Sequence, residues 1–260
     1  MFELSTMTLT IDVGNTETHI GLFREDVLEK DWRLATHPIR TSDEFARELA
    51  GFLDSEGVAW KDLAGVVLGS VVPAATSVVE ETARLRLRKE PVTVHAGLGM
   101  PIEICTRDPH QVGADRIANA VAGCLWREPP VIVVDLGTAT TLDVIASGAR
   151  YIGGVICPGV VASVEELVKR TAKLPSVEMR EPERVIGRDT EECMRSGIIY
   201  GTASQIDGLI SRVRDELGSS CPAIVTGGWA PTIAPFCANV EEVDRHLTLK
   251  GLKVLYDLNC

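Results

Sequence analysis

The chain contains two stretches in which a β-rich run ends at an aspartate and turns through glycine into an alternating run. The first, IDVGNTETHIGLF, begins at Ile11, and the second, VIVVDLGTATTLDVI, begins at Val131. Alternating apolar residues on both sides of a glycine-containing turn are typical of a β-hairpin. Because this strand–turn–strand unit recurs far along the chain, the sequence predicts two similar α/β lobes whose turns line one cleft.

The segments between and after the two hairpins carry helical and strand patterns in alternation. Residues 26–36 are expected to form a third strand after the first hairpin. A buried strand is expected in 63–72, a short strand in 90–96, and a strand before a glycine turn in 221–226. Ser42 or Asp43 is expected to cap the first helix. Helices are expected at 42–57, at 74–89, within 108–126, at 161–174, across 189–218 as one long or two joined helices, and at 247–259.

Charge and hydrophobicity limit the kinds of partner. The net charge is −11 and no run of five lysines and arginines occurs, so nucleic acid is not expected to be a partner. Apolar runs fall short of the roughly 20 residues that cross a bilayer, so no membrane association is expected. The start, MFELSTM, does not resemble a signal peptide, and we expect residues 1–6 to be a disordered extension before Met7.

Seven cysteines are scattered along the chain, and no two of them have CxxC spacing. A zinc site is therefore not expected. An odd number of dispersed cysteines is typical of reduced thiols, which places the protein in the cytoplasm.

Each turn that follows an aspartate is built from glycine and small polar residues: Gly14, Asn15 and Thr16 in the first, and Gly137, Thr138, Ala139 and Thr140 in the second. Such turns expose backbone N–H groups and hydroxyls to a phosphate. Asp12 and Asp135 would repel a phosphate directly, so we interpret them as ligands to a bound cation. Two opposed turns fit the β- and γ-phosphates of a nucleoside triphosphate. The alternative is two ordinary hairpins with Asp and Gly as turn residues.

The stretch VGADRIANA places Asp115 and Arg116 at the start of a helix. A carboxylate in that position is often only a capping group. The functional alternative is that Asp115 accepts a proton from a substrate hydroxyl while Arg116 binds a substrate carboxylate or phosphate. The five histidines show neither metal-ligand nor catalytic-triad spacing.

An ordered set of motifs resembles the type III pantothenate kinases, which are bacterial enzymes of coenzyme A biosynthesis. The motifs run from about Met7 to the end of the chain. In order they are DVGNT, DPHQVGADR, DLGTATT, GGVICPGV, TAKLP, IGRDT, SGIIYG, DGLI, TGG and LTLKGL. The resemblance implies two ribonuclease H-like lobes of the actin, hexokinase and acetate kinase superfamily, residues 7–117 and 118–260, around a central nucleotide cleft.

The resemblance also implies a reaction and a set of site residues. ATP and pantothenate would give ADP and 4′-phosphopantothenate, with Asp115 as the proton acceptor. Asp12 would lie near a divalent cation such as Mg²⁺, and Asp135 would hold a monovalent cation, K⁺ or NH₄⁺. The residues implied to bind ATP are Asp12, Val13, Gly14, Asn15, Thr16, Glu17, Thr18, His19 and Thr138. Those implied to contact pantothenate are Gly113, Ala114, Arg116 and Thr190, the last from the partner subunit of a homodimer.

One position departs from the family pattern. The family usually has a tyrosine three residues before the proline of its P-x-x-V-G-A-D-R motif, where that side chain lines the pantothenate pocket. Thr106 occupies the position here, which predicts a looser or slightly shifted pocket.

Two other functions remain compatible with the sequence. One is a non-catalytic regulator or accessory factor of the same fold that binds nucleotide without transferring phosphate, although such a protein has no need for the carboxylate base. The other is a different small-molecule kinase of the superfamily, acting on a sugar or a carboxylate.

Overall fold

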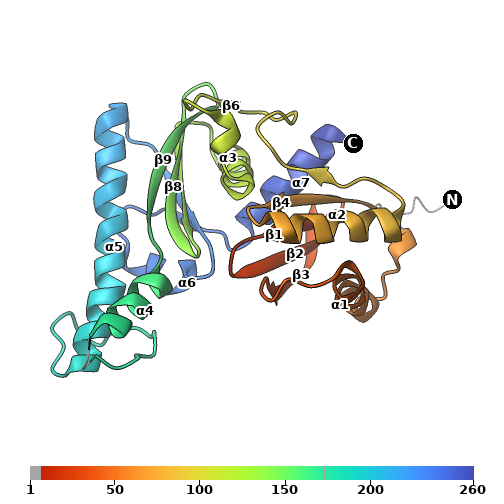
Figure 1. Cartoon of the computed structure of the whole chain (residues 1–260). Helices are drawn as coiled ribbons and strands as arrows, with labels where there is room; N and C mark the ends of the chain where they lie inside the picture. The colour runs from red at the N-terminus through yellow and green to blue at the C-terminus, as the bar shows by residue number, and fades with distance from the viewer. Residues whose placement is uncertain (1–6, 172–173) are drawn as a thin grey trace. The chain divides into compact units, whose positions relative to one another are not determined.

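The computed structural model describes residues 7–171 and 174–260, which form two compact α/β units (Figure 1). The first unit contains the described residues up to Ile102 together with Arg107–Ala122 and Leu247–Cys260. The second contains Glu103–Thr106 and Gly123–His246. The extension predicted at residues 1–6 lies outside the described residues.

The first unit is built on a five-stranded sheet in the order β3-β2-β1-β4-β5. Its strands are β1 (Met7–Val13), β2 (Glu17–Arg24), β3 (Val27–Ala35), β4 (Leu63–Ser70) and β5 (Val92–Thr93). The strand β2 runs antiparallel to both of its neighbours, whereas β1, β4 and β5 are parallel. The predicted hairpin is therefore the β1–β2 pair, with β3 as its third strand.

The second unit repeats this arrangement. Its strands are β6 (Glu103–Ile104), β7 (Val131–Leu136), β8 (Ala139–Ala146), β9 (Arg150–Pro158), β10 (Ala223–Thr226) and β11 (Glu242–Val243), in the order β11-β10-β7-β8-β9-β6. Apart from β6, which pairs with the outer edge of β9, the order and strand directions equal those of the first sheet. The sequence repeat is thus a structural repeat, and the predicted pair of ribonuclease H-like lobes is confirmed.

The helices are α1 (Ser42–Ser55), α2 (Pro73–Leu87), α3 (Ala114–Trp126), α4 (Val160–Arg170), α5 (Thr190–Leu217), α6 (Ala230–Ile233) and α7 (Leu247–Asn259). The segment 189–218 forms one long helix rather than two. The predicted caps of α1, Ser42 or Asp43, were wrong, because the side chain of Thr41 accepts the Glu44 N–H in a reciprocal capping box. Among the described residues, no helix is both long and apolar enough to cross a membrane.

The two faces of the first sheet are covered differently. Leu9, Ile11 and Val13 of β1 pack with α1 and α2 in the main core of this unit. Since side chains alternate along a strand, Thr8, Thr10 and Asp12 point to the opposite face. That face is covered by α7, which approaches closely because glycines lie beneath it: β-carbons on Gly21 and Gly69 would lie 3.0 Å from Leu249 Cδ1 and Leu252 Cδ2.

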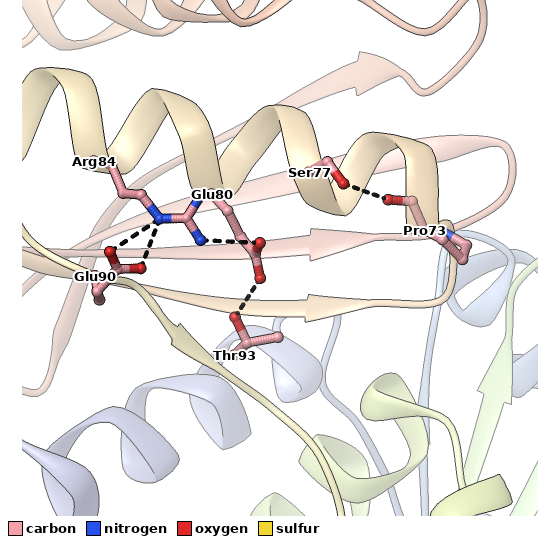
Figure 2. Close-up of polar contacts among 6 residues, drawn as sticks. All are labelled: Pro73, Ser77, Glu80, Arg84, Glu90 and Thr93. Atoms are coloured by element: carbon pink, nitrogen blue, oxygen red, sulfur yellow. Dashed lines mark hydrogen bonds and ion pairs between the residues drawn. The ribbon is translucent and has the colours of Figure 1, made fainter.

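A polar network on the outside of α2 fixes the short edge strand β5 (Figure 2). The guanidinium of Arg84 donates to Glu80 at 3.3 Å and to Glu90 at 2.7 Å. Glu80 in turn accepts a hydrogen bond from the Thr93 hydroxyl at 3.1 Å. A further bond, from the Ser77 hydroxyl to the Pro73 carbonyl at 3.3 Å, lies within the first turn of α2. The network links α2 directly to β5.

The compact units differ from the lobes 7–117 and 118–260 expected from the sequence. The helix α7 belongs to the first unit although it follows the whole of the second in the chain, and the boundary within α3 falls after Ala122. Contacts made by α7 explain its place: Leu252 packs at Gly69, and a β-carbon on Gly251 would lie 1.9 Å from the Ala118 carbonyl oxygen of α3. In the second unit, Ile199, Ile206 and Ile210 of α5 share one core cluster with buried residues of β7 and β10.

Candidate active site

The first predicted phosphate turn connects β1 to β2. It is closed by a hydrogen bond from the Gly14 N–H to the Glu17 carbonyl, 3.0 Å long. The side chains of Asn15, Thr16 and Glu17 are exposed at its tip. Three other residues of the predicted ATP-binding loop, Val13, Thr18 and His19, have buried side chains. The tip is therefore the part of the loop whose side chains are open to a ligand.

Asp12 lies next to this turn, one residue before the end of β1. Its neighbours in the sheet are His19 on β2 and Gly69 on β4. His19 is buried, and its Nε2 lies 2.8 Å from Oδ2 of Asp31 on β3. The side chain of Asp12 is half-buried and, by alternation along β1, belongs to the face opposite α1 and α2.

The start of α3 lies at the same edge of the first sheet. The Val71 N–H donates to the Val13 carbonyl at 3.1 Å, which continues the parallel pairing of β1 and β4 to their carboxyl ends. A β-carbon on Gly113 would lie 3.4 Å from Val71 Cγ1, and one on Gly69 would lie 3.7 Å from the β-carbon of Ala114. The first unit thus brings the DVGNT turn and the VGADR motif together. Loops at the carboxyl ends of parallel strands are the usual ligand sites of such sheets.

Asp115 is half-buried in the first turn of α3. Its Oδ1 accepts the backbone N–H of Arg116 at 2.8 Å. Burial raises the pKa of this carboxyl above its ordinary value, and the Arg116 N–H and guanidinium offset only part of that effect. A carboxylate with a raised pKa holds a proton more readily, as a general base must during proton transfer.

The second predicted turn connects β7 to β8 and is closed by the Gly137 N–H donating to the Ala139 carbonyl at 3.1 Å. Two glycines from other segments, Gly159 and Gly227, lie in close contact with this turn. A β-carbon on Gly159 would lie 2.0 Å from the Thr138 carbonyl oxygen, and one on Gly227, whose φ is +94°, would lie 2.5 Å from Asp135 Oδ1. The GGVICPGV and TGG motifs are therefore parts of this turn's surroundings, a role that residue types alone did not reveal.

Asp135 holds in the second sheet the place that Asp12 holds in the first. Each aspartate is the penultimate residue of its central strand, paired with the antiparallel hairpin strand on one side and a parallel strand on the other. The partners of Asp135 are Thr141 on β8 and Thr226 on β10. Asp135, Thr138 and Thr190 all belong to the second unit, whereas Asp12 and Asp115 belong to the first.

Thr190 is the first residue of α5 and lines a large groove in the second unit. Asp189 caps the helix by accepting the Glu192 N–H at 2.8 Å. The cavity measures about 860 Å³ and lies between α4 and the first turns of α5. Apolar side chains of both helices line most of it, and its polar members are Ser163, Arg188, Asp189, Thr190, Thr202 and Gln205.

Thr106, which replaces the tyrosine usual in the resembled family, belongs to the second unit next to β6. Its hydroxyl oxygen is buried, and the described residues offer it no hydrogen-bond partner. This is an unsatisfied polar atom of the kind that a ligand or water could satisfy.

Each turn, taken by itself, has features that suit phosphate oxygens and a cation. A β-carbon on Gly14 would lie in tight contact with the Glu17 carbonyl oxygen, at 3.1 Å, whereas one on Gly137 would lie at an ordinary contact distance of 3.4 Å from Asp135 Oδ1. Bare backbone there permits close approach of an anion. The adjacent carboxylates, Asp12 and Asp135, are oxygen ligands of the kind that hard cations prefer.

Comparison with known protein families gives a consistent result. The family model described as type III pantothenate kinase matches residues 8–212. A type III pantothenate kinase of Moorella thermoacetica is 42% identical over 255 residues, covering 97% of this chain and 100% of that protein. One from an Exiguobacterium species is 40% identical over 253 residues, covering 97% of this chain and 99% of that protein.

Solved structures with low sequence identity share the fold. The ROK hexokinase of Thermus thermophilus superimposes with a TM-score of 0.54 at 12% identity, covering 96% of this chain and 97% of that one. Component A of the (R)-2-hydroxyglutaryl-CoA dehydratase of Acidaminococcus fermentans gives a TM-score of 0.59 at 16% identity, covering 97% of each chain. The predicted actin- and hexokinase-like fold is thereby confirmed.

Proposed function

The chain belongs to the type III pantothenate kinase family, and we propose that it transfers the γ-phosphoryl group of ATP to the primary hydroxyl of pantothenate, the first step of coenzyme A biosynthesis. The observation that carries the mechanism is the placement of Asp115. A carboxylate with a raised pKa stands at the helix start that packs beside the phosphate turn of the same unit.

Asp115 acts as the general base. It accepts the proton of the pantothenate hydroxyl while the hydroxyl oxygen forms a bond to the γ-phosphorus and the bond from that phosphorus to the β,γ-bridging oxygen breaks. Phosphoryl transfer demands little covalent chemistry from the protein beyond this, because positioning and charge stabilisation supply most of the rate. Arg116, next to the base, binds the substrate carboxylate together with Gly113 and Ala114.

The two turns hold the nucleotide. Residues 12–19 bind the phosphates through the exposed tip of the first turn, and Thr138 contacts ATP from the second. When bound, a divalent ion such as Mg²⁺ neutralises developing charge on the phosphates, and Asp12 would hold it. Asp135 would hold a monovalent ion, K⁺ or NH₄⁺.

The active form is a homodimer in which Thr190 reaches the pantothenate of the partner subunit. The apolar groove beside Thr190 supports this assignment, since it offers a surface that a second chain can cover. The seven free thiols support a cytoplasmic location.

The decisive experiment is a coupled assay of ADP release with ATP in the presence and absence of pantothenate. Pantothenate-dependent ADP release is expected, with 4′-phosphopantothenate as the second product. Binding of ATP with no ADP release would instead favour the accessory-factor function. Release with a sugar or another carboxylate in a substrate panel, and none with pantothenate, would favour a different kinase of the superfamily.

A further inference from the structure

We propose that Thr36, which follows β3, is a positioning residue that aims the backbone amides of the first phosphate turn at the nucleotide. The proposal rests on the proposed function, because it takes the DVGNT turn to be the site of the ATP phosphates. Thr36 lies outside residues 12–19 and is only 3% exposed.

Thr36 is bound to the turn by three hydrogen bonds. Its backbone N–H donates to the Thr16 carbonyl at 2.9 Å. Its hydroxyl donates to the Gly14 carbonyl at 2.8 Å and lies 3.0 Å from the hydroxyl of Thr18. A single residue just after β3 thus binds the carbonyl groups of both Gly14 and Thr16.

The two hydroxyls form a directed chain. The one proton of the Thr36 hydroxyl is used on the Gly14 carbonyl, so the Thr18 hydroxyl must be the donor in the contact between them. Thr18 is itself 6% exposed. The hydrogen bonds therefore run from the Thr18 O–H to the Thr36 oxygen, and from the Thr36 O–H to the Gly14 carbonyl. Both require the Thr36 hydroxyl.

Because peptide groups are planar, the hydrogen bonds to these carbonyls also fix the direction of the neighbouring N–H groups. In a trans peptide the carbonyl of one residue and the N–H of the next point in opposite directions. Because the carbonyls of Gly14 and Thr16 face Thr36, the N–H groups of Asn15 and Glu17 face away from it. Neighbouring amides that point the same way form an anion-binding concavity.

The direction in which these amides point matches the side of the sheet that carries the functional groups. Thr18 pairs with Val13 and Leu34, so it shares their face, which is covered by α1 and α2. Asp12 points to the other face. The hydroxyl that binds the Gly14 carbonyl lies on the α1 and α2 side, so it turns the N–H of Asn15 toward the side on which Asp12 lies.

Thr36→Val keeps the shape of the side chain and removes the hydroxyl. It deletes both side-chain hydrogen bonds, so the turn carbonyls lose their fixed direction and the amides are no longer preorganised for the phosphates. We expect the Kd and the KM for ATP to rise about ten-fold. The KM for pantothenate should stay unchanged, and Thr36→Ser, which restores the hydroxyl, should restore ATP affinity.

Thr82→Val provides the matched control. Thr82 is 2% exposed in α2, and its hydroxyl also makes two contacts, at 2.8 Å to the Val78 carbonyl and 3.1 Å to the Ser42 carbonyl. We expect this variant to lose stability in urea by an amount similar to Thr36→Val while it binds ATP as the wild type does. A purely structural role of Thr36 would make the two variants alike in ATP binding.

The test combines calorimetric titration of ATP without pantothenate, steady-state kinetics with each substrate varied, and urea unfolding. Unchanged ATP affinity in Thr36→Val, or an equal rise in both KM values, would overturn the proposal. If Thr36→Val does not fold, Thr36→Ala, which removes the same hydroxyl and less volume, is judged by the same criteria. A wild type that binds ATP but leaves pantothenate unphosphorylated would refute the proposed function, and the ATP titrations would still decide the role of Thr36.

Discussion

Replacing Asp115 by asparagine is the change that most directly tests the assignment of the base. Asparagine keeps the oxygen that accepts the Arg116 N–H at 2.8 Å, so the start of α3 should be preserved. It cannot take the substrate proton. General bases contribute typically 10²–10⁴-fold, so we expect kcat to fall by that factor, which corresponds to about 2.7–5.5 kcal/mol of lost transition-state stabilisation. The coupled ADP-release assay measures the loss.

The raised pKa of Asp115 also predicts how the stability of the protein depends on pH and how it changes in Asp115→Asn. A group whose pKa is raised on folding stabilises the folded state only below its unfolded pKa, and that contribution is lost as the pH rises through the folded value. Near neutral pH the buried carboxylate therefore destabilises the fold, and Asp115→Asn should unfold in urea at the same or a higher concentration than the wild type. In the pH profile of the wild-type kcat/KM, the apparent pKa of the acidic limb should lie above the ordinary pKa range of aspartate. This limb should be absent from the profile of Asp115→Asn.

A surface aspartate of similar geometry serves as control. Asp62 is exposed and accepts the Ala59 N–H at 2.9 Å, so Asp62→Asn makes the same chemical change away from the site. We expect its kcat to equal that of the wild type. Near-normal turnover in Asp115→Asn would falsify the assignment of the base. A lost turnover accompanied by a clearly lower urea midpoint would show that the carboxylate serves the fold instead.

Three further predictions concern the second turn and the glycine contacts. Turnover should be faster in potassium or ammonium than in sodium, because a bound monovalent ion offsets the charge of Asp135, and equal rates in the three salts would argue against the ion site. Gly227→Ala places a β-carbon 2.5 Å from Asp135 Oδ1 at a φ of +94°. The free energy of unfolding in urea should therefore fall by about 1–3 kcal/mol, and the affinity for ATP should weaken. An unfolding midpoint equal to that of the wild type would contradict the close contact. Gly251→Ala, whose β-carbon would lie 1.9 Å from the Ala118 carbonyl oxygen, should lower the free energy of unfolding by roughly 1–3 kcal/mol. Gly208→Ala in α5, where a β-carbon meets nothing within 4 Å, should raise it by about 0.5–1 kcal/mol. Similar effects of the two substitutions would contradict the packing of α7.

Features determined by neighbouring residues could be predicted from the sequence. The hairpins after Asp12 and Asp135 follow from period-two alternation around a glycine turn, and the structure places both aspartates at equivalent positions. Helix ends were less certain because several polar residues compete for a cap. Thr41 caps α1 in place of Ser42 or Asp43, and α4 ends at Arg170, short of the expected residue 174.

Features that depend on distant contacts could not be predicted. The periodicity of residues 247–259 indicated a helix but not that it would lie on Gly21 and Gly69 of the first unit. Likewise, no local pattern links Thr36 to a turn some twenty positions earlier, because that link consists of hydrogen bonds between segments that are far apart in the sequence. The motif spacing could not show that Asp115 would lie near the DVGNT turn; the packing of Gly113 against Val71 provides that information.

The place of α7 also has a consequence for biosynthesis. Ribosomes complete the second unit, which ends at His246, before they make α7, the helix that covers the Asp12 face of the first sheet. Until α7 emerges, the close-packing site over Gly21 and Gly69 remains open to water and to other nascent chains. Domains usually fold as units while synthesis proceeds. In this protein the second unit therefore has all of its residues before the first unit receives its last helix, α7.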